Sequence, residues 1–107
     1  MKYSLALMIS ALMLTPAVAQ SVQLGPGDAA HGRVIANTWC SLCHLVAPGE
    51  NRAVVADVPT FTSIAQRLPT DVDVLAAFIA NPHPPMPNLG LSRQDIKDIL
   101  AYIATLK

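Results

Sequence analysis

Two thiols and an imidazole lie within five consecutive residues, Cys40-Ser41-Leu42-Cys43-His44. Thiols three positions apart on one helical turn can each add to a vinyl group along one edge of a porphyrin, and the histidine that follows then lies under the iron. C-x-x-C-H is the attachment signature of c-type haem. The segment therefore predicts Cys40 and Cys43 as thioether links to one covalent haem c, with His44 as an axial ligand of its iron.

The second axial ligand is predicted in a proline-rich loop over residues 82–91. Met86 lies between Pro85 and Pro87, and it is the only methionine after residue 19. Iron held by histidine and methionine is the arrangement of electron-transfer cytochromes, and the fixed backbone angles of prolines stiffen a ligand loop. We expect Met86 to be the second axial ligand, and His83 in the same loop is the alternative.

Three other interpretations of the cysteine pair fit the sequence less well. A dithiol redox motif should follow a strand inside a βαβ unit, whereas the residues before Cys40 have a helical pattern. A zinc site normally needs four ligands, and the chain has no second cysteine pair. A disulfide between Cys40 and Cys43 would close too small a loop to stabilise the fold.

Short helices joined by proline-rich loops must position these residues. A first helix is predicted from the N-cap Asp28 to about Leu42, and a second from Pro59-Thr60 to Leu68. The loop between them contains the turn signal Pro48-Gly49. His31, in the first helix, is expected to be a solvated surface residue.

Two capping boxes predict the remaining helices. Thr70 with Asp73 begins a helix that ends before Asn81-Pro82, and Ser92 with Asp95 begins the last one. One face of the third helix should carry Val74, Leu75, Phe78 and Ile79, and the last should bury Ile96, Ile99, Leu100, Ile103 and Leu106. No segment alternates as a strand, so the predicted fold class is all-α.

The first 19 residues have the pattern of a cleaved export signal. Lys2 is followed by the apolar run Leu5–Leu14 and by Ala17-Val18-Ala19, the small-residue ending that a signal peptidase requires. An uncleaved membrane anchor is the alternative, and the apolar run is short for a membrane span. We predict a single domain over residues 20–107, located in the periplasm, with no membrane anchor after cleavage.

The composition of the 107-residue chain limits its partners. The formal net charge is zero and 13% of the residues are charged, so the basic stripe expected of a nucleic-acid binder is absent. Removal of residues 1–19 leaves 88, a length at which a bulky cofactor helps to complete a small core. Such a chain fits a monomer that meets its partners without strong electrostatic steering.

Together, the C-x-x-C-H segment near the start, the methionine loop and the C-terminal helix resemble the class I cytochrome c family over nearly the whole of residues 20–107. The resemblance implies three to four short helices wrapped around one covalent haem, with the terminal helices crossing at Gly32, Ile99 and Tyr102. It also implies Pro59 as the carbonyl that accepts the second N–H of His44, with Pro48 as the nearer candidate in sequence.

One position departs from the family pattern. The aromatic residue usual four positions before the first cysteine is Ala36 here. Trp39, beside Cys40, is expected either to compensate for it or to pack on the porphyrin.

The function implied is that of an electron carrier, not an enzyme, whose partners are redox proteins such as a periplasmic dehydrogenase, an oxidase or another cytochrome. Two alternatives remain open from the sequence. One is a haem enzyme or gas sensor with an open distal site, and the other is a dedicated electron-transfer subunit of a periplasmic dehydrogenase.

Overall fold

The computed structural model describes residues 26–68, 71–82 and 84–107. This part of the chain is helical and contains no strand, which confirms the all-α prediction. The helices are α1 (Ala29–Trp39), α2 (Phe61–Ala65), α3 (Val72–Ala80) and α4 (Arg93–Ala104), with one 3-10 turn, η1 (Cys40–Leu42), directly after α1. None of them has the length and hydropathy required for a membrane span. The predicted export signal, residues 1–19, lies outside the described residues.

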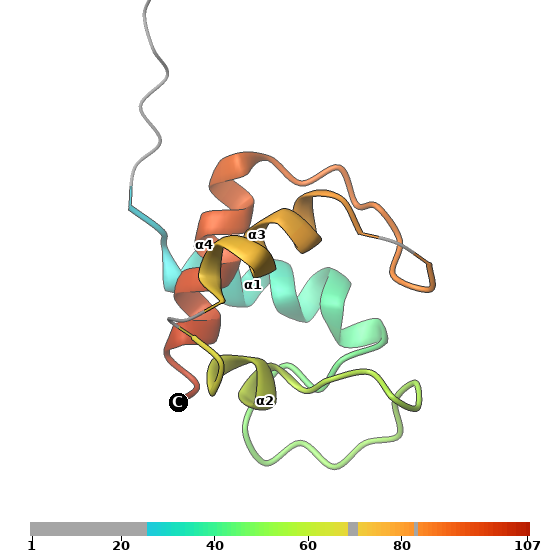
Figure 1. Cartoon of the computed structure of the whole chain (residues 1–107). Helices are drawn as coiled ribbons and strands as arrows, with labels where there is room; N and C mark the ends of the chain where they lie inside the picture. The colour runs from blue at the N-terminus through green and yellow to red at the C-terminus, as the bar shows by residue number, and fades with distance from the viewer. Residues whose placement is uncertain (1–25, 69–70, 83) are drawn as a thin grey trace, which may run out of the picture.

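The two terminal helices cross, and the crossing forms the centre of the fold (Figure 1). A Cβ atom added at Gly32 of α1 would lie 1.9 Å from the carbonyl oxygen of Asp98 and 2.8 Å from the amide nitrogen of Ile99, both on α4. Only glycine allows backbones to approach this closely. The predicted crossing at Gly32 and Ile99 is therefore confirmed.

The boundaries of α1 and α4 follow from their caps. The side chain of Asp28 accepts the N–H groups of Ala30 and His31 at the start of α1. At the start of α4, Ser92 and Asp95 form the reciprocal bonds of a complete capping box. Both predicted N-caps are confirmed, and the first helix is shorter than predicted, because its last turn tightens into η1.

Helices α1, α2 and α4 together supply most of the core, and α4 contributes through its apolar stripe. The buried apolar cluster comprises Ile35, Ala36, Val46, Phe61, Ala65, Leu68, Ile99, Tyr102, Ile103 and Leu106, and Ile96 is buried beside it. Leu100 differs from the prediction. It is only partly buried, because it borders an open groove between α3 and α4.

Helices α2 and α3 both pack against α4. The hydroxyl of Thr60 caps α2 by accepting the N–H of Ser63 at 3.0 Å, and after Ala65 the chain continues to Leu68 as a turn. The N-cap residue of α3 is Asp71, and its side chain makes no capping bond. The capping box predicted at Thr70 lies outside the described residues.

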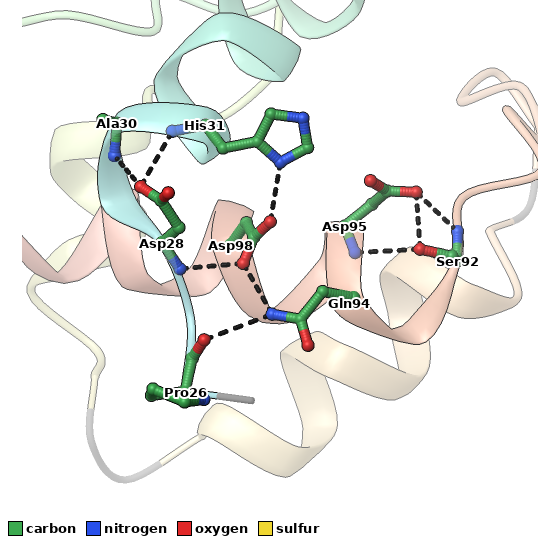
Figure 2. A network of polar contacts seen from close by, with 8 residues as sticks. All are labelled: Pro26, Asp28, Ala30, His31, Ser92, Gln94, Asp95 and Asp98. Atoms are coloured by element: carbon green, nitrogen blue, oxygen red, sulfur yellow. Dashed lines mark hydrogen bonds and ion pairs between the residues drawn. The ribbon is translucent and has the colours of Figure 1, made fainter. Parts of the chain in front are cut away.

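The prediction that His31 is a surface residue is confirmed, since its side chain is 51% exposed, but the histidine also has a specific partner that was not predicted. Its Nδ1 atom lies 2.7 Å from Oδ2 of Asp98, a carboxylate that is only 3% exposed (Figure 2). The other oxygen of Asp98 accepts the N–H of Asp28 and the side-chain amide of Gln94, both at 2.8 Å. These bonds join α4 to the first turn of α1, and they hold the pKa of Asp98 below and that of His31 above the usual values.

Candidate cofactor-binding site

A cavity of about 490 Å³ opens beside the crossing of the terminal helices. The end of α1, the segment before α2, α2 itself, α3, the proline-rich loop and α4 all contribute to its wall. The wall is predominantly apolar, and the four side chains predicted on one face of α3 line it: Val74, Leu75, Phe78 and Ile79. A cavity of this kind suits a large, mostly apolar ligand.

The two thiols lie on the wall of this cavity and are not joined by a disulfide. The turn η1 holds them, because the N–H groups of Cys43 and His44 both donate to the carbonyl of Cys40, at 3.1 and 2.9 Å. Burial raises the pKa of the Cys40 thiol. A reactive redox cysteine has a lowered pKa, so the burial of Cys40 disfavours dithiol redox chemistry.

The histidine of the motif has a fixed orientation. Nδ1 of His44 lies 2.7 Å from the carbonyl oxygen of Pro59, the residue that the resemblance implies. Because a carbonyl can only accept, Nδ1 carries the hydrogen and the lone pair remains on Nε2. The ring also packs at a tilt on Phe61, with centroids 5.5 Å apart. A metal-binding histidine is usually oriented by such a second bond.

Met86 lines the same cavity from the proline-rich loop, and Pro85 and Pro87 line it on either side. The structure thus brings a thioether sulfur, an imidazole and two thiols to one cavity from segments more than 40 positions apart in the chain. His83, the alternative ligand, lies outside the described residues.

Trp39 and Ala36 lie in different environments. Ala36 is fully buried in the core, whereas Trp39 is 53% exposed and lines the cavity. Trp39 therefore does not fill the place of the family's aromatic residue. Its location fits the other expectation, contact with whatever occupies the cavity.

The sequence analysis missed a polar cluster behind His44. Glu50 accepts the N–H groups of Val46 and Ala47 at 2.7 and 3.0 Å, and these bonds, with Arg52 nearby, hold its pKa below the usual value. Arg52 lies 3.5 Å from Glu50 and donates to the carbonyl of His44. The turn signal Pro48-Gly49, followed by the acid Glu50 and the base Arg52, was the signal that could have indicated it.

The donors fit a covalent haem c better than a zinc ion. Within the described ranges, the metal-compatible group of three His, Cys, Asp or Glu side chains is His31, Asp95 and Asp98, which contains neither cysteine. The cavity instead offers two thiols on one turn, one imidazole lone pair and one thioether on an apolar wall. These are the groups that would link a porphyrin edge and occupy both axial positions of its iron.

Comparison with known proteins gives one clear relative. The chain is 45% identical over 96 residues to cytochrome c-552 of Bradyrhizobium diazoefficiens, a match that covers 90% of each chain. No family model matches the sequence. No solved structure matches it either.

Proposed function

Since this chain belongs to the class I c-type cytochromes, we propose that it is a periplasmic electron carrier with His44 and Met86 as the axial ligands of one haem c. It is a carrier and not an enzyme. The observation that supports this proposal is the convergence of Cys40, Cys43, His44 and Met86 on one apolar cavity.

Haem c, when bound, supplies one-electron exchange between ferrous and ferric iron. Cys40 and Cys43 would hold it by thioether bonds, and His44 would ligate the iron through Nε2. The bond from Nδ1 to Pro59 keeps the imidazole in one tautomer and orientation. Met86 would occupy the remaining axial position, and the apolar wall keeps water away from it.

The cellular setting follows from the sequence. The pattern of residues 1–19 supports export to the periplasm and release from the membrane by cleavage. The partners would be redox proteins, such as a dehydrogenase, an oxidase or another cytochrome. Encounter interfaces of electron-transfer proteins are small and weak, which suits a monomer whose formal net charge is only −1 once Lys2 is removed with residues 1–19.

The deciding experiment is an optical spectrum of the exported protein and of two variants. We expect a c-type haem spectrum whose ferric form shows the weak red band of methionine ligation. Met86→Ala should abolish this band, lower the potential and allow rapid binding of CO or cyanide. Leu89→Ala is the matched control, because it shortens another cavity side chain of the same loop without removing a donor.

Other outcomes would favour other assignments. If Met86→Ala keeps the spectrum and potential of the wild type, the methionine is not a ligand and His83 should be replaced next. Rapid CO binding to the wild type would support a haem enzyme or gas sensor. Co-purification of a larger subunit would indicate a dedicated component of a dehydrogenase.

A further inference from the structure

The peptide that follows His44 is held by two side chains of the next turn. Glu50 receives the N–H groups of Val46 and Ala47 on one carboxylate oxygen, and its other oxygen faces Arg52. Arg52 in turn donates to the carbonyl of His44. We name this pair, Glu50 and Arg52, the Glu50–Arg52 clasp.

Two further bonds attach the same peptide to the core. The N–H of Phe61 donates to the carbonyl of Leu45 at 2.9 Å, and the hydroxyl of Tyr102 donates to the carbonyl of Val46 at 2.7 Å. The carbonyls of three consecutive residues therefore have partners from three different segments. Only Arg52 among these partners carries a charge.

From this arrangement we propose that Arg52 is a positioning residue for His44, and that its charge favours the reduced state of the iron. The inference rests on the proposed function. The guanidinium fixes the carbonyl of the ligand residue itself, while Glu50 holds the guanidinium and the two following amides. A fixed positive charge on the histidine side of the cavity disfavours the added positive charge of ferric iron, so it raises the reduction potential.

Solvent limits the size of this charge effect. The Arg52 side chain is 39% exposed and that of Glu50 27% exposed, so water and salt screen both charges. Glu50 partly neutralises the charge of Arg52, and this also reduces the effect on the potential. We therefore expect a modest shift of potential that becomes smaller as ionic strength rises.

The first test is redox titration of the holoprotein at low and at high salt. Arg52→Gln should have a lower potential than the wild type at low salt, and the difference should shrink at high salt. Arg52→Lys keeps the charge and should restore most of the potential. Arg93→Gln, in the first turn of α4 and outside the cavity wall, is the control for net charge and should behave as the wild type.

A wild-type potential in Arg52→Gln at low salt would overturn the inference, as would an equal shift in Arg93→Gln. Both results leave the haem and its axial ligands in place, so they would not affect the proposed function. Absence of covalent haem from the wild-type protein would instead overturn the proposed function.

The second test does not depend on electron transfer. In Glu50→Ala, hydrogen exchange at the amides of Val46 and Ala47, measured by NMR, should be at least tenfold faster than in the wild type, because both lose their acceptor. Asp73→Ala removes an acid outside the clasp and should leave these two amides unchanged. Unchanged exchange in Glu50→Ala would show that the clasp does not hold the peptide after His44, whatever Arg52→Gln yields.

Discussion

Replacing Gly32 by alanine should destabilise the holoprotein, although alanine is the better helix former. The added methyl group would lie 1.9 Å from the carbonyl oxygen of Asp98 and 2.3 Å from its carbonyl carbon. An ordinary contact between such atoms is about 3.5 Å or more, so the crossing helices would have to separate by roughly 1.5 Å. The obstacle is backbone of α4, which cannot rotate away as a side chain can.

The size of the effect follows from two opposing contributions. Alanine in place of glycine in a helix interior stabilises by about 1 kcal/mol. Overpacking of a close-packed core costs about 1–3 kcal/mol, and the upper end applies here because Ile35 and Ile99 would lose their contacts with the shift. The net loss is about 2 kcal/mol, which corresponds to a fall in Tm of roughly 8–16 °C for a domain of this size.

Urea unfolding of the ferric holoprotein, followed by far-UV circular dichroism, measures this loss. Gly49→Ala is the control, since a Cβ there meets no atom within 4 Å and only its φ of +77° is unfavourable. That strain should cost about 1 kcal/mol. A Gly32→Ala protein as stable as the wild type, or more stable, would refute the close crossing of α1 and α4.

Three further predictions concern the polar contacts of α4. Asp98→Asn should lower the free energy of unfolding by about 2 kcal/mol at neutral pH, because the charged hydrogen bonds of the buried carboxylate are lost. Since the pKa of Asp98 is lowered in the folded state, this difference from the wild type should vanish as the pH falls well below 3.8. His31 has a raised pKa, so its stabilisation is complete below about pH 6.5 and is lost as the pH rises through the folded-state value. His31→Gln should therefore differ most from the wild type near pH 6 and less near pH 9, in urea unfolding at each pH. Tyr102→Phe should cost about 1–3 kcal/mol, because the buried carbonyl of Val46 loses its donor, and unchanged stability would contradict that bond.

The parts of the fold that could be predicted from the sequence are those with local signals. The capping residues Asp28 and Ser92 were identified because they bond to amides two or three positions away. The four-residue face of α3 and the stripe of α4 follow helical periodicity. Pro59 came from the family resemblance, and it is the residue whose carbonyl His44 contacts.

What could not be predicted depends on partners far apart in the chain. His31 has no local sign of its role, since Asp98 is 67 positions away. Leu100 belongs to the apolar stripe, but nothing in the stripe shows that the helix beside it leaves a groove open. The bond from Tyr102 to Val46 spans 56 positions and joins a hydroxyl to a backbone group, which has no side-chain pattern to detect.

The position of Trp39 makes it an intrinsic fluorescent reporter of the cofactor cavity. It is the only tryptophan of the chain, and it lines the cavity, as does its neighbour in sequence, Cys40. A strongly absorbing group in that cavity would quench its emission by energy transfer, and separation of the two on unfolding would restore it. The intrinsic fluorescence of the unmodified protein can therefore report loss of cavity structure without any added label.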